Sequence, residues 1–331
     1  MTSLSGYHLL LADPSACLRW LALRDLYNRP ADDPEIQELQ DLRLHDLQVT
    51  ELLELQEEDG SWSLGVLAAS GRTGSRTLET AFALARLGYW GFDANLPAVR
   101  QGADYLFRQQ QVDGSWPLSA EAALTDGNSE MPAKERYSMI PLQTAFPLRG
   151  LAACGYATDP HCEQAYDWLL AQRVEDGAWP TGVAAGVYGY VAGYRKLAHS
   201  RWGCRSNTTG ALICLALHPE RRTSEPARRA LDLLLERETR ELTSLGLEVA
   251  RLAGAEPAHG FFTYFARFDL ALLLDLCGRV GISKSEPRTA GLLEFIRAQQ
   301  GKYGLWETAD WPQAARWVSF DLLRSLRRLG W

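Results

Sequence analysis

One aspartate is surrounded, at helical spacing, almost entirely by apolar residues. On a helix expected over Phe261–Cys277, the positions three, four or seven residues from Asp269 are Phe262, Phe265, Leu272, Leu273 and Leu276. Removal from water raises the pKa of a carboxyl group and favours its protonated form, which can donate a proton. We therefore take Asp269 as a candidate catalytic acid. The structural alternative is an aspartate that pairs with an arginine, such as Arg267, or that bonds the ends of neighbouring helices.

Two further carboxylates lie in segments that are otherwise apolar. Glu79 stands near the start of an expected helix with Arg76 three residues before it, and Asp321 has Arg324 and Arg328 three and seven residues after it. Opposite charges three or four residues apart form ion pairs on a helix. We keep Glu79 as a second candidate catalytic residue, although a salt bridge is the preferred interpretation. Asp321 is interpreted as part of a structural ion pair.

Histidine and cysteine show no spacing that is typical of a metal site. His199, Cys204, His218 and His259 are isolated from one another in the sequence. The six cysteines contain no C-x-x-C pair and lie mostly in apolar stretches, which favours reduced, buried thiols. We expect neither a metal nor a cofactor.

Four related phrases mark the elements that must position these side chains. They read QEEDGSW at 56–62, QQVDGSW at 110–116, QRVEDGAW at 172–179 and QGKYGLW at 300–306. Their tryptophans are 54, 63 and 127 residues apart, the last step being about two periods, and such a recurrence indicates an array of supersecondary units. Asp-Gly favours a turn, the glutamine amide can satisfy helix-end groups, and the tryptophan can bury its ring and bond through its indole N–H. We interpret the phrase as a structural link between consecutive units.

Helical stretches of two compositions alternate along the chain. The first kind is apolar nearly all round, which is typical of buried helices: Ala16–Leu26, Thr77–Leu87, Leu142–Cys154, Thr208–Leu217, Phe261–Cys277 and Ala315–Leu329. The second kind has one charged face: Asp33–Gln56, Pro97–Gln110, His161–Gln172, Glu225–Glu236 and Glu286–Gln299. We find no strand-like alternation. The pattern predicts an all-α fold, a single α/α-toroid domain over residues 1–331 with six inner and five to six outer helices.

Composition limits the classes of partner. The 331 residues are 46% hydrophobic and carry a net charge of −7, which argues against nucleic acid. No apolar run reaches the ~18 residues that a membrane span needs, and the first eleven residues lack the features of a signal peptide. We expect a cytoplasmic protein without a transmembrane segment. The composition is compatible with peripheral membrane contact, and it does not indicate the oligomeric state.

The four phrases resemble the QW motifs of the terpenoid cyclase and protein prenyltransferase superfamily. The resemblance runs from about Pro14 to Gly330, and the chain is also similar to bacterial single-domain squalene-cyclase-like proteins. It implies an α/α toroid whose inner helices line a central cavity for a hydrophobic, isoprenoid-type small molecule. Two signatures of relatives are missing, D-x-D-D and C-G-E-Q. No catalytic residue is therefore carried over from the resemblance.

Seven residues are expected to bind the substrate if such a cavity exists. They are Tyr137, Phe146, Trp202, Asn207, Phe262, Tyr264 and Phe265. Aromatic rings attract cations through their quadrupole, so such a wall could guide a carbocation. Ordinary core packing is the competing interpretation of the same aromatic residues.

These observations lead to one functional hypothesis and two alternatives. The first is a terpene-cyclase-like enzyme that acts on a prenyl or polyprenyl substrate by acid-initiated carbocation chemistry, with Asp269 as the acid. The second is a non-catalytic isoprenoid- or lipid-binding or interaction module on the same toroid. The third, a carbohydrate-active toroid with paired carboxylates, ranks last because QW repeats are not its signature. Whether the protein is an enzyme stays open at this stage.

Overall fold

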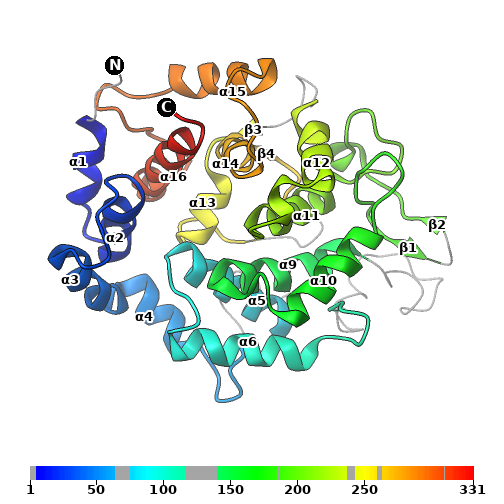
Figure 1. Cartoon of the computed structure of the whole chain (residues 1–331), viewed down its shortest axis with the longest axis horizontal. Helices are drawn as coiled ribbons and strands as arrows, with labels where there is room; N and C mark the ends of the chain where they lie inside the picture. The colour runs from blue at the N-terminus through cyan, green and yellow to red at the C-terminus, as the bar shows by residue number, and fades with distance from the viewer. Residues whose placement is uncertain are drawn as a thin grey trace.

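Helices form an inner ring and an outer layer, as Figure 1 shows. The computed structural model describes residues 5–63, 75–116, 140–184, 187–236, 243–258, 263–308 and 310–331. This arrangement confirms the predicted all-α fold of the α/α-toroid type.

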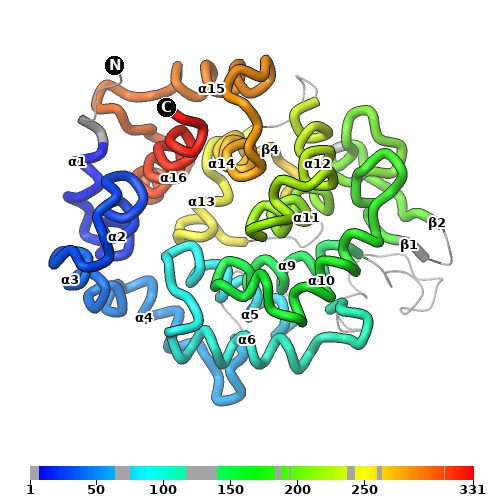
Figure 2. Tube along the Cα trace, viewed as in Figure 1, coloured from blue at the N-terminus to red at the C-terminus, as the bar shows by residue number. Residues whose placement is uncertain are grey.

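The inner helices pack against one another in order around the ring. They are α2 (Ala16–Asp25), α5 (Arg76–Tyr89), α9 (Pro141–Leu151), α11 (Arg205–Leu217), α14 (Leu270–Val280) and α16 (Ala315–Arg328). Helix α5 contacts α9, which contacts α11, and the series continues through α14 to α16. The last inner helix, α16, also packs against α2, so the two ends of the chain meet (Figure 2). A short helix, α13 (Leu247–Leu252), contacts both α5 and α16.

The outer helices begin with residues that suit a helix start. They are α3 (Pro34–Leu42), α4 (Leu47–Glu54), α6 (Pro97–Gln109), α10 (Pro160–Ala171), α12 (Glu225–Leu235) and α15 (Pro287–Ala298). Proline occupies the first turn of most of them, where its missing N–H costs no hydrogen bond. The remaining elements are short: α1 (Ser5–Leu11), η1 (Arg43–His45), the π-turn η3 (Ala152–Tyr156), η4 (Gly193–Arg195), η5 (Arg221–Thr223), η7 (Pro312–Ala314) and the strands β1 (Val183–Ala184), β2 (Val187–Tyr188), β3 (Thr243–Ser244) and β4 (Phe268–Asp269).

Two predicted helices have the wrong bounds, and an aspartate explains each case. The expected outer helix 33–56 breaks at Asp46, whose backbone is extended. The Asp46 carboxylate instead accepts hydrogen bonds from Ser15 Oγ and from the N–H groups of Ala16 and Cys17, at 2.7–2.9 Å, and so holds the start of α2. The expected inner helix 261–277 begins only at Leu270, because Asp269 is its N-cap residue.

The repeated tryptophans are fully buried and link three elements each. In every copy the indole N–H donates to a carbonyl ten residues earlier, on the preceding outer helix, at 2.7 Å. The backbone N–H of the same tryptophan donates to a threonine or serine hydroxyl of the next inner helix, at 2.8–3.2 Å. The interpretation of the phrase as a structural link is therefore confirmed.

The glutamine of the phrase makes the corresponding link between outer helices. Gln56 Nε2 donates to Ala98 O at the start of α6, at 2.9 Å, and Gln110 makes the same bond to His161 O of α10. In the third copy Arg173, not Gln172, stands six residues before the tryptophan, and its guanidinium contacts Glu225 of α12 at 3.3 Å. The last glycine of each phrase has a positive φ, between +77° and +94°, which explains why it is glycine.

One hydrophobic cluster extends through the described helices, from Leu10 to Leu329. All six cysteines lie in described residues, are buried and form no disulfide, as their positions in the sequence predict. None of the helices described here combines the length and apolar character that crossing a membrane requires.

Candidate functional site

A cavity of about 660 Å³ lies within the ring of inner helices, and we call it the central cavity. Its lining comes from α13 and from residues near the C-terminal ends of α2, α5, α9, α11, α14 and α16. Six arginines line it, Arg24, Arg149, Arg279, Arg324, Arg327 and Arg328. Four carboxylates accompany them, Asp25, Glu248, Asp275 and Asp321. Helix C-termini carry partial negative charge, so their convergence explains the excess of cations.

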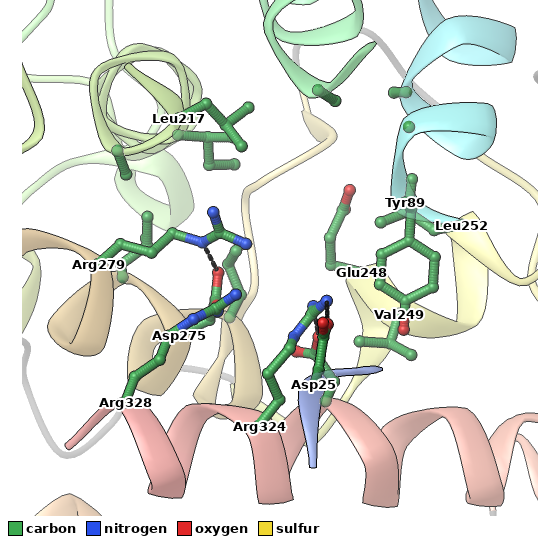
Figure 3. Close-up of a pocket in the computed structure, with 18 of the residues that line it drawn as sticks. Asp25, Tyr89, Leu217, Glu248, Val249, Leu252, Asp275, Arg279, Arg324 and Arg328 are labelled. Carbon is green, nitrogen blue, oxygen red and sulfur yellow. Dashed lines mark hydrogen bonds and ion pairs between the residues drawn. The ribbon is translucent and has the colours of Figure 1, made fainter. Parts of the chain in front are cut away.

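Apolar side chains make up the rest of the wall. They include Ile213, Leu217, Val249, Leu252, Leu272 and Leu276. Figure 3 shows Arg279, Asp275 and Arg328 on one side of the cavity, Tyr89, Val249 and Leu252 on the other, and Glu248 between them. A molecule in this space would meet hydrocarbon and charge together, which suits an amphiphile better than a plain hydrocarbon.

Asp275 is the centre of an ion-pair network on α14 and α16. Its Oδ2 accepts from Arg279 Nε at 2.5 Å, and its Oδ1 accepts from Arg328. Burial alone would raise the pKa of Asp275, but the guanidinium groups of Arg279, Arg328 and Arg324 hold that pKa well below its ordinary value. Asp321 pairs with Arg324, as the sequence spacing predicts, whereas Arg328 contacts Asp275 instead. Burial raises the pKa of Asp321 despite this partner.

A second ion pair lies deeper in the cavity wall. Arg149 Nη2 is 2.5 Å from Glu248 Oε1, and the two side chains are 8% and 5% exposed. The Tyr264 hydroxyl also donates to Glu248 Oε1, at 3.4 Å. Burial opposes the charge of Arg149, but the neighbouring Glu248 carboxylate raises the pKa of the guanidinium overall.

Three of the predicted substrate-binding aromatics come together beside this ion pair. The ring of Tyr264 lies 5.0 Å from that of Phe146 and 4.6 Å from that of Phe265, in edge-to-face contact. The Arg149 guanidinium is 5.9 Å from the Phe265 ring centroid. The three aromatics are buried core residues, and none of them is among the residues that line the central cavity.

Asp269 joins two helix starts. Its Oδ1 accepts from the N–H groups of Gly246 and Ala271, at 2.8 and 3.1 Å, and its Oδ2 accepts from Glu248 N at 2.7 Å. The expectation of a carboxylate on an apolar helix face is therefore corrected, because the residue caps α14 and holds the start of α13. Arg267 is exposed, whereas Asp269 is buried. Burial raises the pKa of Asp269 to about 6, although the three backbone N–H groups oppose this shift.

The raised pKa of Asp269 has a consequence for stability. Because the folded pKa, about 6, exceeds the ordinary value of 3.8, this residue stabilises the fold fully below pH 3.8, and the contribution is lost as pH rises through 6. Relative to the variant Asp269→Asn, which cannot titrate, the wild type should lose about 2 kcal/mol between pH 4 and pH 7. Urea unfolding of both proteins across this range measures the difference, and a difference that does not change with pH would contradict the shift.

The other predicted site residues lie elsewhere or outside the described chain. Glu79 is buried on α5 and is not among the residues that line the central cavity, while Arg76 pairs with Asp59 at 3.2 Å. Asn207 Oδ1 accepts from Leu142 N at 2.9 Å and so joins the starts of α11 and α9. Trp202 packs on Tyr188, with ring centroids 5.5 Å apart.

Tyr137 and Phe262 lie outside the described residues. Within the described ranges, no three histidine, cysteine or acidic side chains are grouped so that they could hold a metal ion.

Of the charged residues that line the central cavity, sequence reasoning named Asp321, Arg324 and Arg328 only as an ion pair and missed the others. Glu248 lies on α13, a helix of six residues that is too short to give a periodic pattern. Arg149 did offer a signal, since it is a single charge on the apolar helix α9, and Asp275 and Arg279 have the four-residue spacing of an ion pair.

Part of the chain is similar to a known protein family. Residues 36–197 match the family model of the squalene-hopene cyclase C-terminal domain. Just under half of the chain is therefore similar to a squalene-cyclase domain. Over 129 residues, the chain is 30% identical to the squalene–hopene cyclase of Zymomonas mobilis subsp. mobilis. That match covers 39% of the chain but only 18% of the enzyme, so the chain corresponds to less than a fifth of its relative.

Solved structures are also similar to the chain. A variant of the type II terpene cyclase MstE from Scytonema, in complex with geranylgeranyl dihydroxybenzoate, has a TM-score of 0.49 and 16% identity, with 85% of this chain and 74% of that chain covered. A protein from Actinoplanes has a TM-score of 0.48 and 15% identity, with 99% and 98% covered.

Proposed function

We propose that the protein holds an isoprenoid-type molecule in the central cavity and acts on it as a terpene-cyclase-like enzyme. The observation that supports this most directly is the cavity of about 660 Å³ inside the ring of a toroid that is similar in part to a squalene-cyclase domain. Its volume falls within the ~300–1,000 Å³ of small-molecule sites. The aliphatic wall of α11, α13 and α14 offers the surface on which a prenyl chain would pack.

Asp269 and the three aromatics do not line the central cavity, so in this proposal the reacting part of the substrate extends beyond the lining toward them, and Asp269 supplies the proton that starts the reaction. Burial raises its pKa to about 6, so it keeps a proton to a higher pH than an exposed aspartate does. The O–H bond breaks as a C–H bond forms on the alkene, and the resulting cation is stabilised by the rings of Phe146, Tyr264 and Phe265. Loss of a proton from the final cation back to Asp269 restores the acid, so the net reaction is an isomerisation.

A specific observation favours the alternative of a non-catalytic isoprenoid- or lipid-binding module. Both carboxylate oxygens of Asp269 accept backbone N–H groups, and neither Asp269 nor Glu79 is among the residues lining the central cavity. A residue so engaged fits a structural N-cap. On this alternative the toroid binds its ligand without converting it.

Mass spectrometry of the products distinguishes the proposed enzyme from the binding module. Purified protein is incubated with farnesyl and geranylgeranyl diphosphate, squalene and squalene epoxide. If the proposal holds, a cyclised product forms, falls by about 100-fold or more in Asp269→Ala and in Asp269→Asn, and decreases as pH rises above about 6. Bound isoprenoid without product would support the binding module, and neither binding nor product would contradict both.

A matched control distinguishes lost chemistry from lost structure. Asp46 holds the start of α2 as Asp269 holds the start of α13, but none of the residues that donate to Asp46 lines the cavity, whereas Glu248, which donates to Asp269, does. Asp46→Asn should therefore leave the turnover per folded molecule unchanged. Equal losses in the two variants would mean that Asp269 acts only through stability.

A further inference from the structure

The deep ion pair of the central cavity has one donor and one acceptor that no neighbour uses. Arg149 and Glu248 are joined through Nη2 and Oε1 alone, at 2.5 Å. Within the described chain, Arg149 Nη1 and Glu248 Oε2 have no hydrogen-bond partner. Arg251 Nη1 is 3.8 Å from Glu248 Oε2, too far for a hydrogen bond, and donates instead to Tyr264 O at 2.6 Å. The unused N–H and the unused oxygen therefore belong to one ion pair.

Both residues are buried and line the cavity. Arg149 is 7% exposed and Glu248 is 4% exposed, and Figure 3 shows the Glu248 side chain reaching into the space between the two walls. A buried polar atom without a partner carries a cost that a matching ligand atom removes. A single group that contacts both atoms has to accept one hydrogen bond and donate another.

Charge at this position selects among ligands. Exposed arginine side chains mark the mouth of the cavity, with Arg24 at 42% and Arg328 at 30%, whereas the Arg149 and Glu248 side chains are at 8% and 5%. An anionic group beside the deep pair would satisfy Arg149 but would face Glu248 Oε2, a carboxylate oxygen that accepts no hydrogen bond. A hydrocarbon would satisfy neither atom.

We propose that Arg149 and Glu248 form a polar subsite that binds the hydroxyl group of an otherwise apolar alcohol or phenol. The hydroxyl oxygen accepts from Arg149 Nη1, and its O–H donates to Glu248 Oε2. The adjoining apolar wall, including Val249 and Leu252 of the same helix as Glu248, contacts the hydrocarbon part. The assignment of that part as an isoprenoid rests on the proposed function, whereas the hydroxyl subsite rests on the ion pair alone.

Equilibrium dialysis with matched ligands tests the subsite. Farnesol, β-farnesene and farnesyl diphosphate share a chain and differ in the head group, and 1-dodecanol and dodecane repeat the comparison without an isoprenoid. The wild type should bind each alcohol at least ~10-fold more tightly than its hydrocarbon, since hydrogen bonds to charged groups are the stronger kind. It should bind farnesol more tightly than the diphosphate, because the negative charge of the diphosphate would face the Glu248 carboxylate. In Glu248→Gln the preference should fall below ~3-fold, because the carboxylate acceptor is lost.

The controls make each outcome decisive. Glu163→Gln removes a carboxylate that pairs with Arg221 at 2.6 Å away from the cavity lining, and it should keep the full preference. Arg149→Lys provides a second variant if Glu248→Gln does not fold, and the wild-type comparison needs no variant at all. Hydrocarbon or diphosphate bound as tightly as the alcohol would overturn the subsite while leaving isoprenoid binding intact. A preference for dodecanol without binding of any isoprenoid would support the subsite and contradict the proposed function, and no binding at all would overturn both.

Discussion

Replacement of Trp179 by alanine should lower the free energy of unfolding by about 3–5 kcal/mol. The indole is fully buried and its N–H donates to Leu169 O at 2.7 Å, so its removal leaves a cavity and takes from that carbonyl its indole hydrogen bond, leaving only the one from Gln172 N at 3.2 Å. A loss of this size is a large part of the ~5–15 kcal/mol that stabilises a typical protein. Trp179→Phe keeps most of the ring and should lose only about 1–3 kcal/mol, chiefly for the missing hydrogen bond. Urea unfolding followed by circular dichroism measures both values.

An exposed tryptophan provides the control. Trp331 is 48% exposed and stacks with Arg297, whose guanidinium carbon is 3.9 Å from the ring centroid. Trp331→Ala should cost less than about 1 kcal/mol. Similar losses for Trp331→Ala and Trp179→Ala would show that the repeated tryptophans are not the links between the helix layers.

The same repeated residues explain why the fold could be predicted from the sequence. Each phrase contains a turn glycine, a tryptophan that bonds the previous outer helix and, in three copies, a glutamine six residues before it. These requirements are local, and the residues that meet them keep nearly the same spacing within each phrase. One structural interpretation of the phrase therefore applies to every unit. In the third phrase the glutamine stands seven residues before the tryptophan, and Arg173, which stands six residues before it, makes the contact with the next outer helix instead.

The candidate site could not be predicted in the same way. Asp269 was recognised as a buried carboxylate, but the apolar run before it resembles a helix, so its role as the N-cap of α14 was missed. The central cavity joins residues as distant in sequence as Asp25 and Arg328, which meet only because α16 packs against α2. Helical periodicity indicates which face of a helix is buried. It does not indicate which end of a ring remains hollow.

Asp275→Asn should lower the free energy of unfolding by about 3–5 kcal/mol, because it leaves buried guanidinium groups without their counter-ion. Asp275 is 8% exposed and contacts both Arg279 and Arg328, with Arg324 nearby. Burial already lowers the pKa of Arg328 to about 10, although Asp275 opposes that shift. Without the carboxylate, the positive charges of α14 and α16 repel one another across a poorly solvated space.

The dependence on pH and a surface control distinguish this result from a general effect of mutation. Because the pKa of Asp275 is lowered in the folded protein, its contribution is present above the unfolded value of ~3.9 and is lost as pH falls. The difference between wild type and Asp275→Asn should therefore shrink below about pH 4. Asp232 pairs with Arg288 at 2.8 Å, but both side chains are more than a third exposed, so Asp232→Asn should cost at most about 1 kcal/mol. If the two aspartate variants lost equal stability at pH 7, the network would be an ordinary surface ion pair, and the charged wall of the cavity would not be held in place by Asp275.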